Sequence, residues 1–256
     1  RMSSRTVQSD VTCCLHTVHT YKVDGAEVQG KLLPIIDRRY MAMRASFHVE
    51  QGQTLTVEKL TVVTTSRDLA YDVLDNKAER AQEDGGKMIE AAAAEGYDKL
   101  FAASNAKWAE LWAKADVQVK SERPFDQLLV RFALYHLNIM AKKDDNRVGI
   151  GAKGMTGEGY KGHSFWDTEI FILPYFILTQ PKAARSLLEY RYKGLYGARR
   201  KAQENGFTGA MYPWEAAWVD DGEVTPLWGA ADVVTGKPMK ILTGIIEQHI
   251  TADVAF

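Results

Sequence analysis

Cysteine is scarce in this sequence: only Cys13 and Cys14 occur, and they are neighbours. Adjacent cysteines have poor geometry for a disulfide bond. Nothing in the sequence therefore calls for an oxidising compartment, and we expect a cytoplasmic protein. Long apolar runs are also missing, since no stretch approaches the roughly 18 residues of a membrane span. The first residues, "RMSSRTVQSD", lack the apolar middle part of a secretory signal. We therefore expect no membrane partner.

An excess of charge of one sign is absent as well. The 256 residues contain 32 basic and 33 acidic side chains, which leaves a formal net charge of −1. No block of lysine and arginine is present that could follow a phosphate backbone, so we expect no nucleic-acid partner. No group of histidine, cysteine or carboxylate side chains has the spacing of metal ligands, and we expect neither a metal nor a cofactor. What is abundant is apolar material, at 46% of residues, which is enough for a folded core.

The first 70 residues or so have the pattern of β-strands. In "YMAMRASFHVE" the apolar residues Met41, Met43 and Ala45 alternate with polar ones, which predicts a strand with one buried face. The turn sequence "QGQ" leads into "TLTVEKLTVVTTS", which is rich in β-branched residues. We expect these two segments to form a β-hairpin. A further strand is expected in "VTCCLHTVHTYKV", and the whole segment is interpreted as the end of a larger β domain.

Helical patterns replace this alternation from about residue 76. Alanine, lysine and glutamate dominate residues 76–116, where Gly96 is expected to separate two helices. The pattern returns after Pro124, and further helices are predicted at 168–179, 182–204 and 245–256. No strand is predicted after residue 120. Helices joined only by loops favour helical hairpins over a parallel α/β sheet.

A glycine-rich stretch, "GIGAKGMTGEGYKG", occupies residues 149–162. Gly149, Gly151 and Gly154 have the spacing of a dinucleotide-binding motif, but a helix and not a strand precedes them, so we reject that interpretation. The lysine at 153 lacks the spacing and the following Ser or Thr of a phosphate-binding loop. We interpret the stretch as a long loop that borders a ligand site.

Two segments place tryptophan beside acidic residues: "FWDTE" at 165–169 and "YPWEAAW" at 212–218. An indole can stack on the apolar face of a sugar ring, while a neighbouring carboxylate accepts hydrogen bonds from sugar hydroxyls. Trp166 with Asp167 and Trp214 with Glu215 are thus candidates for two halves of a carbohydrate pocket. The alternative is structural: the tryptophans belong to the core, and Asp167 is the N-cap of the helix that begins near Thr168.

Three long segments resemble the central region of glycoside hydrolase family 65. They are "IGAKGMTGEGYKGHSFWDTEIFILPYF", "ARSLLEYRYKGLYGARRKAQENGFTGAMYPWE" and "TGIIEQHITADVAF". That family includes inverting maltose, trehalose, kojibiose and nigerose phosphorylases and acid trehalases. The resemblance implies a multidomain α+β protein. We expect the C-terminal part of an N-terminal β-sandwich at 1–72, a helical linker at 73–120, and the first half of an (α/α)6 catalytic barrel at 121–256.

The resemblance also implies site residues and a reaction. Trp166 and Asp167 are expected to bind the glucosyl unit, with Trp214 and Glu215 near the same pocket, while Glu169 packs or supports it. The reaction is phosphorolysis of an α-linked glucose disaccharide by inorganic phosphate, which gives β-glucose 1-phosphate and glucose. A trehalase-like inverting hydrolase on the same fold is the first alternative, and a noncatalytic carbohydrate-binding fragment is the second.

One part of the family pattern is missing. The family's general acid lies in a "DEYH"-type segment, which does not occur in these residues. No glutamate of this sequence is assigned that role. We expect the general acid to lie beyond Phe256, this chain to be a piece of a longer enzyme, and the piece to be inactive alone. The resemblance further implies a homodimer.

Overall fold

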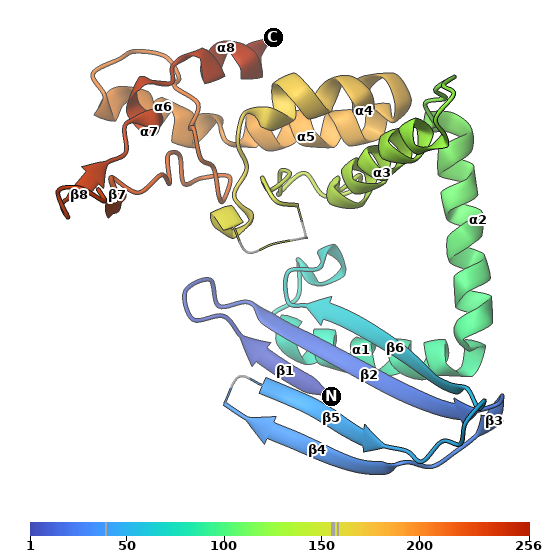
Figure 1. The fold of residues 1–256 in the computed structure, drawn as a ribbon. Helices are drawn as coiled ribbons and strands as arrows, with labels where there is room; N and C mark the ends of the chain where they lie inside the picture. Colours follow the sequence, from blue (N-terminus) through green and yellow to red (C-terminus); the bar gives the residue numbers. More distant parts are fainter. Residues whose placement is uncertain (39, 155–156, 158) are drawn as a thin grey trace. The chain divides into compact units, whose positions relative to one another are not determined.

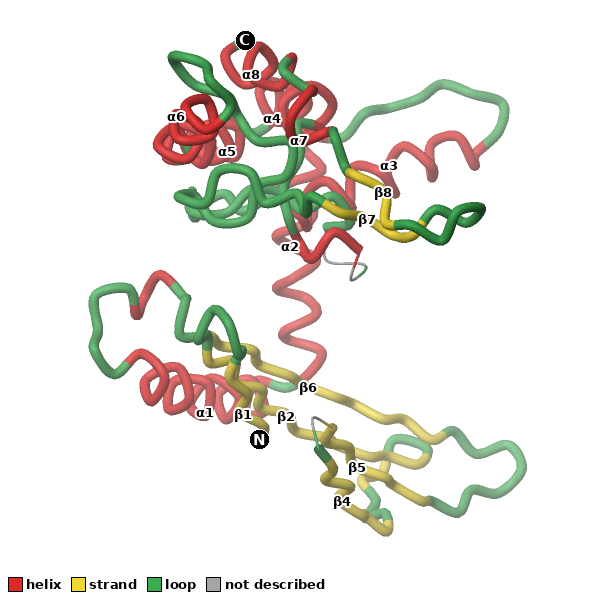
Figure 2. Tube along the Cα trace, turned by 90° about the vertical axis from the view of Figure 1, so that its left-hand side faces the viewer, coloured by secondary structure: helices red, strands yellow, loops and turns green. Residues whose placement is uncertain are grey.

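The computed structural model describes residues 1–38, 40–154, 157 and 159–256. It is a mixed α/β structure of small sheets and helices (Figures 1 and 2). The chain divides into two compact units, Arg1–Ala109 and Glu110–Phe256. Among the described residues, no helix is both long enough and apolar enough to cross a membrane. The family-like boundaries expected at residues 72 and 120 stay a prediction.

The first unit is built on an antiparallel sheet centred on β2. Its strands are β1 (Met2–Arg5), β2 (Thr12–Val23), β3 (Ala26–Glu27) and β6 (Leu55–Thr65). Strand β2 pairs with β6 along its whole length, from Cys13 opposite Thr65 to Val23 opposite Leu55. Helix α1 (Lys77–Glu95) packs against β2 and β6. The buried Cys14 and His16 lie on the sheet face that this packing covers, and Gly85 of α1 lies against His16.

The expected hairpin between 40–50 and 54–66 is wrong. Strand β5 (Tyr40–Ser46) pairs instead with β4 (Lys31–Asp37) in a separate two-stranded sheet, and β6 pairs with β2. The alternating pattern does predict both strands, but it carries no information on the partner of either. The predicted burial of one β5 face is also not seen, since Met41 and Met43 are 40% and 46% exposed.

Gly96 separates α1 from α2 (Tyr97–Ala115), as predicted. Its φ of +82° lies in the left-handed region, which glycine adopts without a steric penalty and which ends a helix.

The second unit is largely helical. Its helices are α3 (Pro124–Met140), α4 (Leu173–Thr179), α5 (Pro181–Lys193), α6 (Leu195–Glu204), α7 (Thr243–Ile246) and α8 (His249–Ala255). A π-helical turn, η3 (Thr168–Ile172), leads directly into α4. Helices α4 and α5 lie side by side (Figure 1) and share a core around the fully buried Phe176. Helices α3, α4 and α5 each have a proline in the first turn. Proline lacks a backbone N–H, and at this position the helix offers no acceptor for one, so proline is tolerated where a helix begins.

Two findings in this unit differ from the sequence prediction. A short antiparallel pair, β7 (Trp228–Ala231) and β8 (Pro238–Lys240), lies where no strand was expected. The apolar residues that recur at helical spacing after Pro124 would be expected to be buried, but Leu128 and Phe132 are 59% and 61% exposed. Leu134 and Asn138 of α3 are buried, and Leu137 and Met140 pack against the core around Phe176. Asn138 donates to the Tyr175 hydroxyl.

Candidate functional site

The two tryptophan–carboxylate segments are joined by their backbones. Ser164 and Ala216 form an antiparallel bridge, with N–H to O distances of 2.8 Å and 2.9 Å in the two directions. Ser164 also bridges Gly151, so the glycine-rich loop continues the same small ladder. The backbones beside the two segments are therefore paired, with the glycine-rich loop next to them, while a shared pocket of their side chains stays a prediction.

Trp166 and Asp167 stand at the start of η3. The indole of Trp166 is half-buried, with the Phe171 ring 5.5 Å away and the His249 imidazole 4.8 Å away, measured between ring centroids. Asp167 occupies the N-cap position of η3, but its side chain makes no capping hydrogen bond. Its carboxylate is exposed and bonds to none of the residues that the structure describes. The structural alternative of an N-capping aspartate is therefore not realised.

Trp214 and Glu215 contact residues on the partner segment of the Ser164–Ala216 bridge, namely Phe165 and His163. The Phe165 and Trp214 rings meet edge to face at 5.9 Å. The Glu215 carboxylate lies 2.7 Å from Nδ1 of His163, and both side chains are mostly buried. Each segment thus contributes one ring and one polar side chain to the contact between them. His163 is 52 residues from Glu215 in sequence, and the two side chains meet beside the Ser164–Ala216 pairing.

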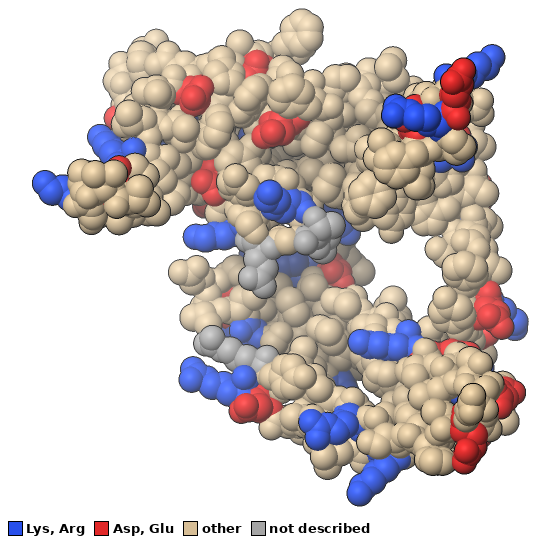
Figure 3. All heavy atoms as spheres, in the orientation of Figure 1, with Lys and Arg blue, Asp and Glu red and all other residues tan. Residues whose placement is uncertain are grey.

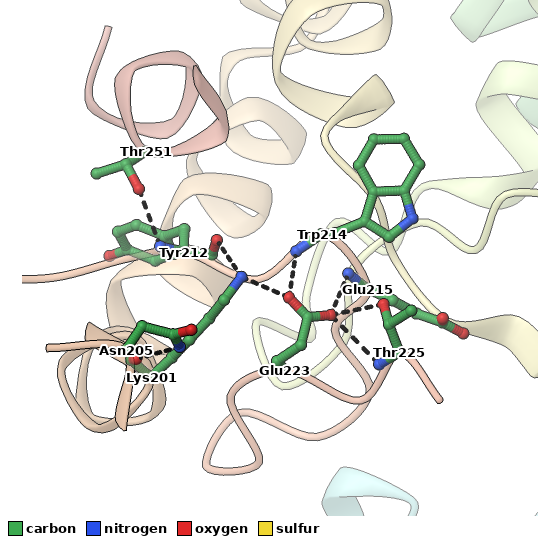
Figure 4. A network of polar contacts seen from close by, with 8 residues as sticks. All are labelled: Lys201, Asn205, Tyr212, Trp214, Glu215, Glu223, Thr225 and Thr251. Carbon is green, nitrogen blue, oxygen red and sulfur yellow. Dashed lines mark hydrogen bonds and ion pairs between the residues drawn. The ribbon is translucent and has the colours of Figure 1, made fainter. Parts of the chain in front are cut away.

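The mostly buried carboxylate of Glu223, which the sequence analysis did not select, fixes the Trp214–Glu215 backbone (Figure 4). It accepts hydrogen bonds from the backbone N–H groups of Trp214 at 2.9 Å and Glu215 at 3.0 Å, and from the Thr225 hydroxyl at 2.7 Å. It also forms an ion pair with the buried Lys201 of α6. Figure 4 shows the Trp214 indole and the Glu215 carboxylate pointing away from Glu223.

The protonation state of Glu223 follows from these contacts. Burial raises the pKa of its carboxyl, but hydrogen bonds from Lys201 and Thr225 and the charge of Lys201 outweigh burial, so the net pKa is lowered. Glu223 is therefore ionised at neutral pH and acts as an acceptor only. This chemistry suits a structural anchor and not a proton donor.

Glu169 has a different environment from Asp167, two residues earlier. Its carboxylate receives two hydrogen bonds from Arg191 of α5, at 2.7 Å and 2.9 Å, and the side chains of both residues are 4% exposed. Arg191 also donates to the Phe165 carbonyl at 3.0 Å. A charge this deeply buried needs such a partner. Of the two carboxylates beside Trp166, one is therefore committed to the interior and the other is available to solvent.

The glycine-rich loop approaches the site closely. A Cβ atom at Gly149 would collide with Ser164 and Tyr190, so this glycine allows the loop to lie against the bridge. Tyr160 and Lys161, next to the site, adopt left-handed backbone angles with φ of +60° and +55°. The Tyr160 ring meets Phe165 edge to face at 5.2 Å. Residues 155, 156 and 158 of the loop lie outside the described residues.

Among the described residues, no group of three or more His, Cys, Asp or Glu side chains is arranged to hold a metal ion. On the face seen in Figure 3, basic and acidic side chains are interspersed with each other.

Family models match both units. The model for the glycosyl hydrolase family 65 central catalytic domain matches residues 131–256, and the model for the N-terminal domain of the same family matches residues 1–111.

Similar proteins have a consistent description. A kojibiose phosphorylase of Halothermothrix orenii is 44% identical over 256 residues, which is 100% of this chain and 32% of the relative. A kojibiose phosphorylase of Caldanaerobacter subterraneus subsp. tengcongensis is 46% identical over 82% of this chain and 26% of the relative. A kojibiose hydrolase of Flavobacterium johnsoniae is 40% identical over 64% of this chain and 22% of the relative.

A solved structure supports the fold. A candidate kojibiose phosphorylase from the human microbiome has a TM-score of 0.64, at 20% identity, over 87% of this chain and 27% of that chain. The chain thus spans a third or less of the length of these proteins. Because two family models together match nearly the whole sequence, this chain belongs to glycosyl hydrolase family 65.

Proposed function

We propose that this chain carries the glucosyl-binding part of an inverting disaccharide phosphorylase whose substrates are kojibiose and inorganic phosphate. The observation that supports the proposal is the Ser164–Ala216 bridge, which pairs the backbones next to the two tryptophan–carboxylate segments. Several relatives described as kojibiose phosphorylases, at 40% to 46% identity, support kojibiose over other α-linked glucose disaccharides.

Each of the four residues has a role in this proposal. The half-buried indole of Trp166 is the platform under the glucosyl ring, and the exposed Asp167 carboxylate accepts hydrogen bonds from sugar hydroxyls. Trp214 lines the same pocket, and Glu215 contributes a carboxylate whose position is set by His163. Glu169 does not touch the sugar, because both of its oxygens are bound by Arg191.

The reaction requires two further contributions. Inversion needs a carboxylic acid that protonates the leaving oxygen and a nucleophile on the opposite face of the ring. Phosphate is already an anion, so no second carboxylate is required to activate it. The acid is not assigned to any residue of this chain, in agreement with the missing "DEYH"-type segment. We expect the 256 residues to bind glucose and not to cleave disaccharide alone, with inorganic phosphate as co-substrate and no cofactor.

The architecture of the whole enzyme is part of the same proposal. The paired helices α4 and α5 are compatible with one hairpin of an (α/α)6 barrel, and the sheets of the first unit with the end of a β-sandwich. A homodimer is proposed from the family resemblance, and a cytoplasmic location from the two adjacent cysteines, which call for no oxidising compartment.

Calorimetric titration of the chain with glucose tests the binding role. Asp167→Asn removes charge-assisted hydrogen bonds, each of which contributes about 1.5–3 kcal/mol, so we expect affinity to fall about 10- to 100-fold. Trp166→Ala should abolish measurable binding. The matched controls are Asp220→Asn and Trp228→Ala, which change an exposed carboxylate and an exposed indole elsewhere in the unit. Equal losses in the controls and the site variants would refute the assigned pocket.

A hydrolase on the same fold is the second candidate, favoured by relatives described as kojibiose hydrolases at 40% and 36% identity. Phosphate dependence of the full-length enzyme separates the two. A phosphorylase should release glucose 1-phosphate only when phosphate is present, whereas turnover without phosphate would establish the hydrolase. The absence of any turnover by the full-length protein, together with glucose binding, would favour the noncatalytic carbohydrate-binding alternative.

A further inference from the structure

His249 is the first residue of α8 and lies against Trp166, far from it in sequence. The two rings are nearly perpendicular, at 82°, with centroids 4.8 Å apart. Nδ1 of His249 is 2.7 Å from an Asp253 carboxylate oxygen, and Nε2 is 3.1 Å from a Glu247 carboxylate oxygen. Both ring nitrogens of one imidazole therefore face carboxylates.

This geometry specifies the charge of His249. A neutral imidazole has one N–H donor and one lone pair, and the lone pair would face a carboxylate oxygen. Only the imidazolium form donates from both nitrogens. The hydrogen bond that the His249 ring donates to Asp253 is the main cause of a raised pKa of His249, and Glu247 adds to the effect. These two carboxylates are the charged groups that act on the ring, and the other element packed against it contributes the uncharged Trp166.

An imidazolium at this distance attracts the indole. A cation within about 6 Å of an aromatic centroid is held by the electron density of the ring. Phe171 contacts the same indole at 5.5 Å from within η3. Trp166 is thus held between one contact from its own turn and one from α8, while part of its surface stays exposed.

We propose that His249, held as an imidazolium between Glu247 and Asp253, is a positioning residue that sets the orientation of the Trp166 indole for sugar stacking. The sugar-stacking part rests on the proposed function, whereas the orientation of the indole does not. His249 does not touch the sugar itself in this proposal. It acts by fixing the platform before the sugar binds, which lowers the ordering cost of binding.

Optical titration tests the pairing without any sugar. Protonated imidazole quenches indole fluorescence, so emission of the chain should rise through a midpoint above about pH 6.5, the unperturbed value for histidine. Trp166→Phe and His249→Gln should each remove this transition, and Asp253→Asn should move its midpoint down. His136→Gln is the control, because its ring neighbours in α3 are Phe132 and Tyr135. A transition that persists in Trp166→Phe or in His249→Gln overturns the pairing.

Near-UV circular dichroism and glucose affinity test the positioning. At pH 6 the Trp166 band, defined as the difference between wild type and Trp166→Phe, should be lost in His249→Gln and retained in His136→Gln. Glucose binding by His249→Gln should be about threefold to tenfold weaker, the range expected for one partly exposed cation–π contact. An unchanged band, or unchanged affinity, overturns the proposal. If wild type binds no glucose while the optical changes occur as expected, the proposed function fails and the indole orientation by His249 stands. His249 is exposed, so its replacement should leave the fold intact.

Discussion

The buried pair between Arg191 and Glu169 predicts a large effect for Arg191→Met. The variant removes two hydrogen bonds to Glu169 and one to the Phe165 carbonyl, and it leaves a carboxylate that is 4% exposed without its partner. Loss of one partner of a buried ion pair costs about 3–5 kcal/mol, because the remaining charge cannot be solvated. The folding equilibrium of the second unit should therefore shift by about 150- to 4000-fold.

Urea unfolding followed by tryptophan fluorescence measures this loss. The control is Arg185→Met on the same helix, since the Arg185–Glu189 pair is 82% and 36% exposed and should contribute less than about 1 kcal/mol. The double variant Glu169→Leu/Arg191→Met should recover most of the loss, because two apolar side chains leave no buried charge. A loss in Arg191→Met no greater than in Arg185→Met, or no recovery in the double variant, would refute the burial argument.

Four further substitutions have defined expectations. In α1, Gly86→Ala should raise the melting temperature and Gly85→Ala should lower it, because a Cβ meets no atom within 4 Å at Gly86 but lies 2.7 Å from the His16 ring at Gly85. Burial lowers the pKa of His16, whose ring nitrogens have no hydrogen-bond partner among the described residues. As the pH falls, His16 therefore takes up a proton in the unfolded chain before it does so in the native protein. The free energy of unfolding should decrease below about pH 6.5, until the pH has passed the native pKa. His16→Leu should remove this slope in thermal melts at a series of pH values. Glu223→Gln should lower the free energy of unfolding by about 3 kcal/mol or more in urea titrations, because it leaves the Lys201 ammonium buried without its counter-charge. A loss below about 1 kcal/mol, the contribution of an exposed ion pair, would contradict the anchor role of Glu223.

Local pattern was sufficient to locate most elements. The helices after Gly96 and Pro124 and the strands β2, β5 and β6 all lie where periodicity and turn residues predict them. The partner of β5 is β4, which lies directly before it in sequence but was not predicted as a strand, because Pro34 within it is unfavourable for a strand pattern. The short β7–β8 pair was missed, although a turn signal exists: Asp232 accepts hydrogen bonds from the backbone N–H groups of Val234 and Thr235.

The candidate site was likewise only partly predictable from the sequence. Residue types alone selected Trp166, Asp167, Trp214 and Glu215, because an indole beside a carboxylate is an unusual and chemically specific combination. Nothing in their sequence neighbourhood marks Asp167 as exposed and Glu169 as buried, since both stand beside the same tryptophan. The difference arises because Arg191 approaches only Glu169.

The sequence by itself determined which segments are helical or extended, which family the chain resembles, and which side chains could stack on and hydrogen-bond to a sugar. The tertiary structure alone decided how those side chains are supported: Glu223 and Lys201 hold one half, Arg191 holds the other, and His249 reaches Trp166 from α8. The physical reason is that local preferences act between residues near in sequence. Buried charges and ring contacts instead depend on distances in space, which are set only when the helices and the Ser164–Ala216 bridge have formed.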